Sequence, residues 1–156
     1  MMKLELRYRH LGLVVENMEK ILEFYVGILG QEIVVDLIEE GNYWAALTGV
    51  PNSSSRVVKT RVPDGSVIEI VEFLKPKAII PPSIVYHLKG LNHLAYNVKE
   101  IDTQYEYLKK NGVEFISEVL KSPYDPVKTF FFKDPEDNLL QFVEVTDPNA
   151  IREGLE

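Results

Sequence analysis

Two short stretches of the chain each carry a histidine at the same point of a shared pattern. They cover residues 8–15 (YRHLGLVV) and residues 91–98 (LNHLAYNV). In both, the histidine is followed by Leu, a small residue and an apolar tail that ends in Val. Self-similarity of this kind indicates an internal repeat, and imidazole is a common ligand of divalent metals. His10 and His93 are therefore candidate metal ligands at equivalent repeat positions.

A second matched pair of polar residues lies near the end of each copy. The two segments are residues 63–72 (PDGSVIEIVE) and residues 135–144 (PEDNLLQFVE). Glu69 and Gln141 stand at the same distance from the proline that opens each segment. A lone histidine on a strand is most often a structural residue with its hydrogen bonds satisfied. Two equivalent histidines, together with an acid and an amide at two more equivalent positions, favour metal ligation instead.

The elements that must position these residues follow from the hydrophobic periodicity. Asn17 is a candidate helix cap, and Gly30 stands where a helix C-terminal glycine belongs. The first copy is predicted to contain, in order, a strand over 7–15, a helix over 18–29, a strand over 31–38, a short helix over 42–49 and strands over 56–62 and 66–73. The last two strands are joined by Pro-Asp-Gly, in which Pro fixes φ and Gly permits a positive φ.

The second copy repeats this order. It is predicted to contain a strand around His93, a helix from Ile101 that stops at residues 111–112, and strands over 113–119, 127–133 and 138–145. Its three consecutive phenylalanines, residues 130–132, cannot all face one side of a strand, because side chains alternate between faces. Between the copies, residues 75–89 contain several prolines, which fit poorly inside regular elements, so this stretch is predicted to be a linker.

Each copy is therefore a βαβββ unit. Short turns allow the strands after the helix to pair antiparallel, which gives each unit a small curved sheet with a helix on one face. Two such mixed sheets form an open cup, so we predict an α+β fold. The expected organisation is one domain over residues 1–156, with a first unit at 5–74, a linker at 75–89, a second unit at 90–147 and a tail at 148–156.

Composition limits the partners and the location of the protein. The chain has 156 residues, of which 46% are hydrophobic, no cysteine and a formal net charge of -7. Nucleic-acid binding relies on the attraction of phosphates to basic side chains, so this balance argues against it. No apolar run is long enough to span a membrane, and the N-terminal segment lacks the apolar core of a signal peptide. We expect a cytoplasmic protein that binds a small molecule and has no membrane partner.

These motifs resemble those of the vicinal oxygen chelate superfamily. Its members include glyoxalase I, methylmalonyl-CoA epimerase, extradiol dioxygenases, fosfomycin-modifying enzymes and bleomycin-binding proteins. The similarity rests on His-Leu-Gly-Leu-Val-Val, on His-Leu-Ala-Tyr-Asn-Val and on Asp-Pro-Glu-Asp-Asn-Leu-Leu-Gln-Phe-Val-Glu, and it extends over nearly the whole chain. Glyoxalase-like and methylmalonyl-CoA epimerase-like members are the most similar in kind.

The resemblance implies a metal site and its ligands. Carried over residue by residue, the ligands are His10 and His93 from the first strands and Glu69 and Gln141 from the last strands. Gln141 departs from the family, in which Glu is usual at that position; here the only carboxylate of the set is in the first unit. Two imidazoles, one carboxylate and one amide suit Ni, Co, Mn, Fe or Zn better than Ca, which prefers oxygen ligands.

The activity favoured by the resemblance is that of a divalent-metal-dependent glyoxalase or epimerase. Such an enzyme, a lyase or isomerase, abstracts a proton next to a carbonyl through a metal-bound enediolate, and Glu69 would serve as ligand and base by turns. Two alternatives stay open: an Fe- or Mn-dependent ring-cleaving dioxygenase, and a metal-free drug-binding protein of the bleomycin-resistance type. Because each half-unit buries little surface alone, we also expect a homodimer.

Three further polar residues have less chemical interest. His87 lies in the linker and is expected at the surface rather than at the metal. Glu72 and Glu144 come three residues after the candidate ligands, so strand alternation places them on the opposite face of the sheet, where we expect them to be solvated.

Overall fold

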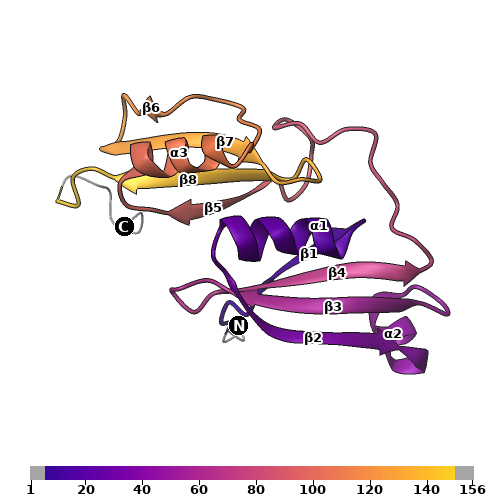
Figure 1. Cartoon of the computed structure of the whole chain (residues 1–156). Helices are drawn as coiled ribbons and strands as arrows, with labels where there is room; N and C mark the ends of the chain where they lie inside the picture. Colours follow the sequence, from indigo (N-terminus) through magenta and orange to yellow (C-terminus); the bar gives the residue numbers. More distant parts are fainter. Residues whose placement is uncertain (1–5, 150–156) are drawn as a thin grey trace, which may run out of the picture. The chain divides into compact units, whose positions relative to one another are not determined.

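The computed structural model describes residues 6–149. The chain divides into two compact units, the first ending at Ile80 and the second beginning at Pro81. Each unit is a βαβββ arrangement built on a four-stranded mixed sheet, which confirms the α+β fold predicted from the repeat (Figure 1). Most of the expected tail, and residue 5, where the first unit was expected to begin, lie outside the described residues.

The first unit has strand order β1-β4-β3-β2. β1 is parallel to β4, and the other neighbours are antiparallel. The elements are β1 (Leu11–Val15), α1 (Met18–Leu22), the π-helical turn η1 (Glu23–Ile28), β2 (Glu32–Glu40), α2 (Gly41–Thr48), β3 (Ser54–Arg61) and β4 (Val67–Lys75). The short helix predicted at 42–49 is thus confirmed as α2, and it ends at Gly49, which has a φ of 71°.

The second unit has the equivalent strand order, β5-β8-β7-β6, with β5 parallel to β8. Its elements are β5 (His93–Asn97), α3 (Ile101–Lys110), β6 (Leu120–Lys121), β7 (Val127–Lys133) and β8 (Leu139–Val145). The first strand, the helix and the hairpin of the second copy were therefore predicted correctly.

The strand predicted over 113–119 is wrong. Of this segment only Phe115 forms a bridge to β7, and the short strand β6 begins after it. Two successive amides, those of Ile116 and Ser117, donate to the single carbonyl of Phe131, and the Ser117 hydroxyl accepts from the Phe131 amide. A side chain thus takes a backbone position in the ladder, and the regular pairing that defines a strand is lost.

The helix predicted over 18–29 changes its hydrogen bonding halfway. α1 begins at the Asn17 cap, whose side-chain oxygen accepts from the Lys20 amide at 3.1 Å, as the sequence predicts. After Leu22 the chain widens into η1, and the Leu29 amide donates to the carbonyl of Phe24, five residues earlier. The apolar stripe is kept through this change, since the side chains of Met18, Ile21, Leu22, Phe24 and Tyr25 are buried.

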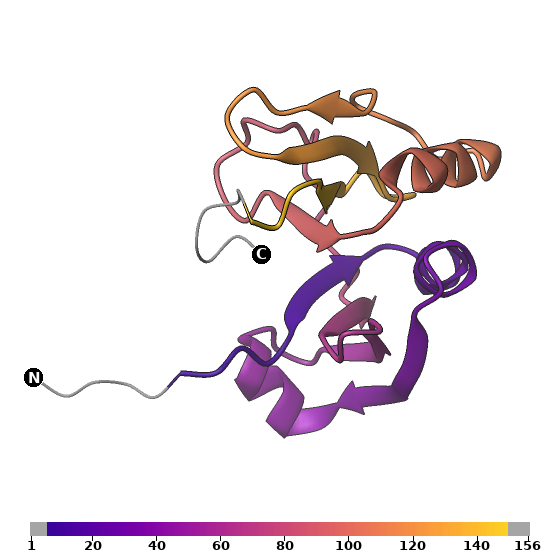
Figure 2. The ribbon, with the colours of Figure 1, turned by 90° about the vertical axis from the view of Figure 1, so that its left-hand side faces the viewer.

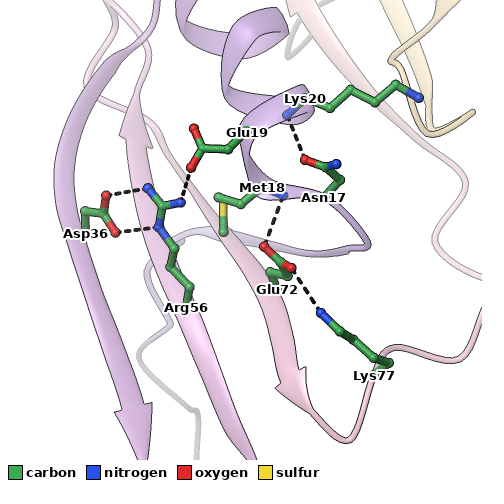
Figure 3. A network of polar contacts seen from close by, with 8 residues as sticks. All are labelled: Asn17, Met18, Glu19, Lys20, Asp36, Arg56, Glu72 and Lys77. Carbon is green, nitrogen blue, oxygen red and sulfur yellow. Dashed lines mark hydrogen bonds and ion pairs between the residues drawn. The ribbon is translucent and has the colours of Figure 1, made fainter.

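In both units an acid of the last strand holds the start of the helix that follows the first strand. Glu72 Oε2 accepts from the Met18 amide at 3.2 Å, as Figure 3 shows. Glu144 Oε1 accepts from the Glu100 amide at the start of α3 at 2.6 Å. The expectation that these two acids are simply solvated is wrong, because the exposed helix amides at a helix N-terminus attract a carboxylate. The Glu72 side chain is only 18% exposed.

A second network ties α1 to the sheet (Figure 3). Arg56 on β3 donates to both carboxylate oxygens of Asp36 on β2, at 2.9 and 2.8 Å, and also pairs with Glu19 of α1. The hydrogen bonds from the Arg56 guanidinium hold the pKa of Asp36 below its ordinary value. These contacts fix the helix over the face of the sheet that it covers.

The capping acids also show which way the candidate ligands face. Since Glu72 reaches α1, the side chains two and four residues earlier, Ile70 and Ile68, point to the same face, and both are buried. Glu69 therefore lies on the face away from α1. In the second unit Phe142 and Leu140 are buried on the α3 face, and Gln141 lies on the other face. In each unit, the part of the core that the first helix covers and the candidate ligands thus lie on opposite faces of one sheet.

The remaining helix, α2, lies on the opposite side of the sheet from α1 (Figure 2). Its Trp44 is buried in a small cluster with Val57 and Val71, which lie on the Glu69 face of the sheet. Within residues 6–149, no helix is both long enough and apolar enough to cross a membrane.

Candidate functional site

The first unit brings His10 and Glu69 together. His10 directly precedes β1, and Gly12 of β1 is in register with Glu69 of β4. His10 Nε2 lies 3.5 Å from Glu69 Oε1, and both side chains are partly buried. Because Gly12 has no side chain, nothing from this position stands between the imidazole and the carboxylate. The two predicted ligands of this unit are therefore neighbours on one face of its sheet.

A lysine that the sequence analysis did not single out completes this cluster. Lys59 of β3 is in register with Glu69, and its Nζ lies 2.9 Å from Glu69 Oε2. Each oxygen of the Glu69 carboxylate thus faces a different partner, His10 on one side and Lys59 on the other. A signal for Lys59 was present, because a hairpin centred on the Pro-Asp-Gly turn brings residues 59 and 69 opposite each other.

The three residues of this cluster line a cavity of about 380 Å³ within the first unit. α2 supplies an apolar wall of this cavity with Tyr43, Trp44 and Leu47. The wall is anchored, since Trp44 Nε1 donates to the Ser55 hydroxyl at 3.0 Å. The volume falls at the lower end of the range typical of small-molecule sites. The remaining lining residues are Arg9, Val35, Leu37, Glu39 and Val57.

In the second unit the equivalent histidine is held by its neighbours. His93 Nδ1 lies 2.9 Å from Asn92 Oδ1, which accepts a hydrogen bond only when Nδ1 carries the proton. That tautomer leaves the lone pair of Nε2 available, as a metal ligand requires. The His93 ring stacks on Tyr86 at 5.8 Å and meets Phe131 edge-on at 5.0 Å. His93 is therefore oriented for ligation, in aromatic surroundings.

Gln141 is oriented in a similar way. Its Nε2 donates to the Thr129 hydroxyl at 2.8 Å, which leaves the amide oxygen as the group open to a ligand. Gln141 is in register with Ala95 of β5 and with Phe131 of β7. Phe131 thus occupies the position that Lys59 holds in the first unit. It also lines the cavity of the second unit, about 490 Å³ in volume and almost wholly apolar, together with Tyr86 and Leu139.

The donor pairs suit a divalent ion in geometry and in chemistry. Two ligands bound at about 2.1 Å to one ion stand about 3.0–3.4 Å apart, close to the separation of His10 Nε2 and Glu69 Oε1. A ligating carboxylate commonly keeps a hydrogen bond on its second oxygen, which here is the contact with Lys59. Neither unit holds a full set alone: among the described residues, no group of three or more His, Cys, Asp or Glu side chains gathers in one place.

The predictions about His87 and about the three consecutive phenylalanines are also answered. His87 is exposed, as expected. Phe130 and Phe132 are fully buried on the α3 face, whereas Phe131 lies on the opposite face with His93, which confirms the predicted alternation.

The chain belongs to the Glyoxalase/Bleomycin resistance protein/Dioxygenase superfamily, whose family model matches residues 7–142. The similarity to the vicinal oxygen chelate proteins inferred from the two repeats is thereby confirmed. Membership supports a function of the glyoxalase, dioxygenase or resistance type. No curated protein sequence is similar enough to count as a match.

Several solved structures share the fold. A glyoxalase family protein from Bacillus cereus is 24% identical, with a TM-score of 0.82 over 92% of this chain and 97% of that one. A glyoxalase family protein from Enterococcus faecalis is 21% identical, with a TM-score of 0.66 over 88% and 97%. A genomically encoded fosfomycin resistance protein from Listeria monocytogenes is 20% identical, with a TM-score of 0.62 over 90% and 92%. At these identities, the likeness concerns the fold.

Proposed function

We propose that this protein is a divalent-metal-dependent enzyme, a lyase or isomerase of the glyoxalase or epimerase kind, which removes a proton next to a carbonyl group of a small molecule. The observation that carries the proposal is the His10–Glu69 pair, whose facing atoms lie 3.5 Å apart in the lining of a cavity. The oriented lone pairs of His93 and Gln141 support it. The proposed ligands are these four residues, and the proposed metal is Ni, Co, Mn, Fe or Zn.

The residues of the first unit divide the work in this proposal. A bound divalent ion supplies Lewis-acid polarisation of the substrate carbonyl. For a substrate that carries a hydroxyl group on the carbon beside that carbonyl, Glu69 moves the proton of this carbon to the carbonyl carbon. The hydroxyl proton passes to the carbonyl oxygen, so the isomerisation is balanced in atoms and charge. Lys59 holds Oε2 of the carboxylate at 2.9 Å and thereby fixes its direction. Trp44 and its apolar neighbours on α2 supply an apolar part of the lining, against which the substrate packs.

The metal content of purified variants tests the ligand set. Protein made without a metal-affinity tag should contain a divalent ion, and His10→Ala and His93→Ala should each lose most of it. His87→Ala is the matched control, because this histidine is exposed and should leave the metal content unchanged. Stoichiometric metal in both His10→Ala and His93→Ala would contradict the proposed ligands.

One observation favours a second candidate, metal-free binding of a small molecule. The ammonium of Lys59 already balances the charge of Glu69, and the equivalent place in the second unit is apolar. A protein that carries no metal after purification, and yet binds a ligand in its cavity, would support this candidate over the enzyme. Oxygen-dependent ring cleavage of a catechol would instead assign the protein to the dioxygenases.

A further inference from the structure

The lining of the cavity of the first unit combines apolar and charged side chains. On α2, the side chains of Tyr43 and Leu47 are 71% and 62% exposed, one helical turn apart, and both line the cavity beside Trp44. The same lining includes His10, Lys59 and Glu69. Exposed apolar side chains that rim a pocket are typical of a surface that a ligand covers.

The charged residues of the lining restrict the chemistry of that ligand. Arg9 and Lys59 are cations, and Glu39 and Glu69 are carboxylates, so the lining carries no net charge. A ligand with several charges of one sign therefore finds no match here. The Lys59 ammonium has three N–H donors, and the contact with Glu69 uses one of them. A single oxygen acceptor next to Glu69 would engage another.

Comparison with the second unit shows that this mixed character is not a property of the fold. The positions opposite Glu69 and Gln141 are filled by Lys59 and Phe131, respectively. The cavity around Phe131 is almost wholly apolar, whereas polar and apolar groups share the lining around Lys59. An oxygen-bearing ligand thus has a donor in the first unit and none at the equivalent place in the second.

We propose that the cavity of the first unit binds a small amphipathic molecule. Its planar apolar part packs against Trp44, Tyr43 and Leu47, and its carbonyl-type oxygen accepts a hydrogen bond from Lys59. The oxygen belongs to a ketone or to a carboxylate, which offer the same acceptor chemistry. This inference deepens the proposed function and rests on it in one respect. In both, the ligand is oriented so that Glu69 lies beside the carbon next to the carbonyl.

The single tryptophan of the chain makes the inference measurable. Because Trp44 lines the cavity, a ligand seated there changes its fluorescence, and no other tryptophan obscures the signal. The probes are benzylacetone, hydrocinnamate, phenylpropylamine and butanone, which offer a ring with a ketone, a ring with a carboxylate, a ring with a cation, and a ketone without a ring. All titrations are made in EDTA, so that they report binding without metal.

We expect saturable binding of benzylacetone, hydrocinnamate or both, and at least about tenfold weaker binding of the amine and of butanone. Which of the first two binds identifies the oxygen as that of a ketone or of a carboxylate. An amine that binds as tightly as the ring-bearing acceptors would overturn the proposal, since the carboxylates would then select the ligand. So would the absence of any saturable response.

Matched variants separate charge from packing. Lys59→Met should weaken binding about tenfold, as expected for loss of a charge-assisted hydrogen bond, and Lys59→Arg should restore most of it. Lys77→Met removes the same charge at an exposed position outside the cavity and should have no effect. Equal binding by Lys59→Met and Lys77→Met, or failure of Lys59→Arg to restore binding, would overturn the role of Lys59.

The apolar wall has its own control. Leu47→Ser should weaken binding about fivefold, because an apolar contact is lost. Leu120→Ser is the matched change at a comparably exposed leucine of the second unit and should leave binding unchanged. If Leu47→Ser binds like Leu120→Ser, the ligand does not lie on α2. Failure of the proposed enzyme would appear in metal content and turnover instead, so the two results are distinguishable.

Discussion

At the scale of single residues, the carboxylate of Glu69 lies between two different partners, an imidazole and an ammonium group. His10 faces Oε1 and Lys59 faces Oε2, so the carboxylate is directed without being enclosed. A base must keep one oxygen accessible to the substrate, and a ligand must present one oxygen to the metal. In the proposed function Glu69 takes these two roles by turns, and replacing it by Gln tests them separately.

Glu69→Gln should retain much of the bound metal and lose turnover. The amide oxygen can still coordinate, whereas a neutral amide cannot accept the proton, so the loss should match a general-base contribution of about 10²–10⁴-fold. The measurement is anaerobic exchange of solvent deuterium into a trial hemithioacetal or thioester. Glu32→Gln makes the same change on β2, outside the lining of the cavity, and should exchange normally. Unchanged exchange in Glu69→Gln would remove Glu69 as the base.

The sequence predicted part of this cluster and missed part of it. His10 and Glu69 were found because each has an equivalent in the second copy, and the structure places the pair together. Lys59 has no such equivalent, since its counterpart is Phe131, so a search based on the repeat could not select it. Finding Lys59 requires the register of the hairpin, which the turn defines and periodicity alone does not.

At the scale of elements, the two acid-to-helix contacts have a clear energetic role. Glu72 and Glu144 each accept a backbone N–H at a helix start that otherwise lacks an intrahelical partner. The positive end of the helix adds an attraction to the carboxylate. Each acid lies on the last strand of its unit, and each helix follows the first strand. The contact therefore links the last part of each unit in sequence to its first part.

Glu72→Ala should lower the free energy of unfolding by about 1 kcal/mol, the usual cost of losing a helix cap. Glu144→Ala should cost a similar amount, because it removes the equivalent contact. Urea denaturation measures both changes, with Glu118→Ala as the control at an exposed glutamate. A loss in Glu72→Ala no larger than in Glu118→Ala would mean that solvent replaces the contact at no cost.

The elements that were predicted correctly are those with a local cause. α2 ends where Gly49 adopts a positive φ, and α1 begins where Asn17 caps it, and both signals are readable in the sequence. The segment 113–119 failed because the Ser117 side chain interrupts the ladder to Phe131, a contact between residues distant in the chain. The change from α-helical to π-helical hydrogen bonding at η1 was missed for a different reason, because the apolar stripe is the same before and after it.

At the scale of the whole molecule, the segment that joins β4 to β5 carries large apolar side chains that are exposed. Ile79 and Leu91 are each 96% exposed. Isolated exposed apolar residues are common, but several in one segment mark a surface that another molecule covers. Together with the small size of each unit, this supports the proposal of a homodimer.

Sedimentation at micromolar concentration should therefore show a dimer. Leu91→Asp places a charge in the segment and should shift the protein towards the monomer, because burial of an unpaired charge is costly. Leu120→Asp, at another exposed leucine, should leave the assembly unchanged. A monomer in the unmodified protein at this concentration would contradict the proposal.

The two units agree at some positions and differ at others. The acids that hold the helices, Glu72 and Glu144, are the same in both units, whereas the residues facing the candidate ligands, Lys59 and Phe131, are not. The two sets lie on opposite faces of each sheet. The lining of one cavity can therefore be charged and that of the other apolar, while the contacts that hold the two helices stay the same.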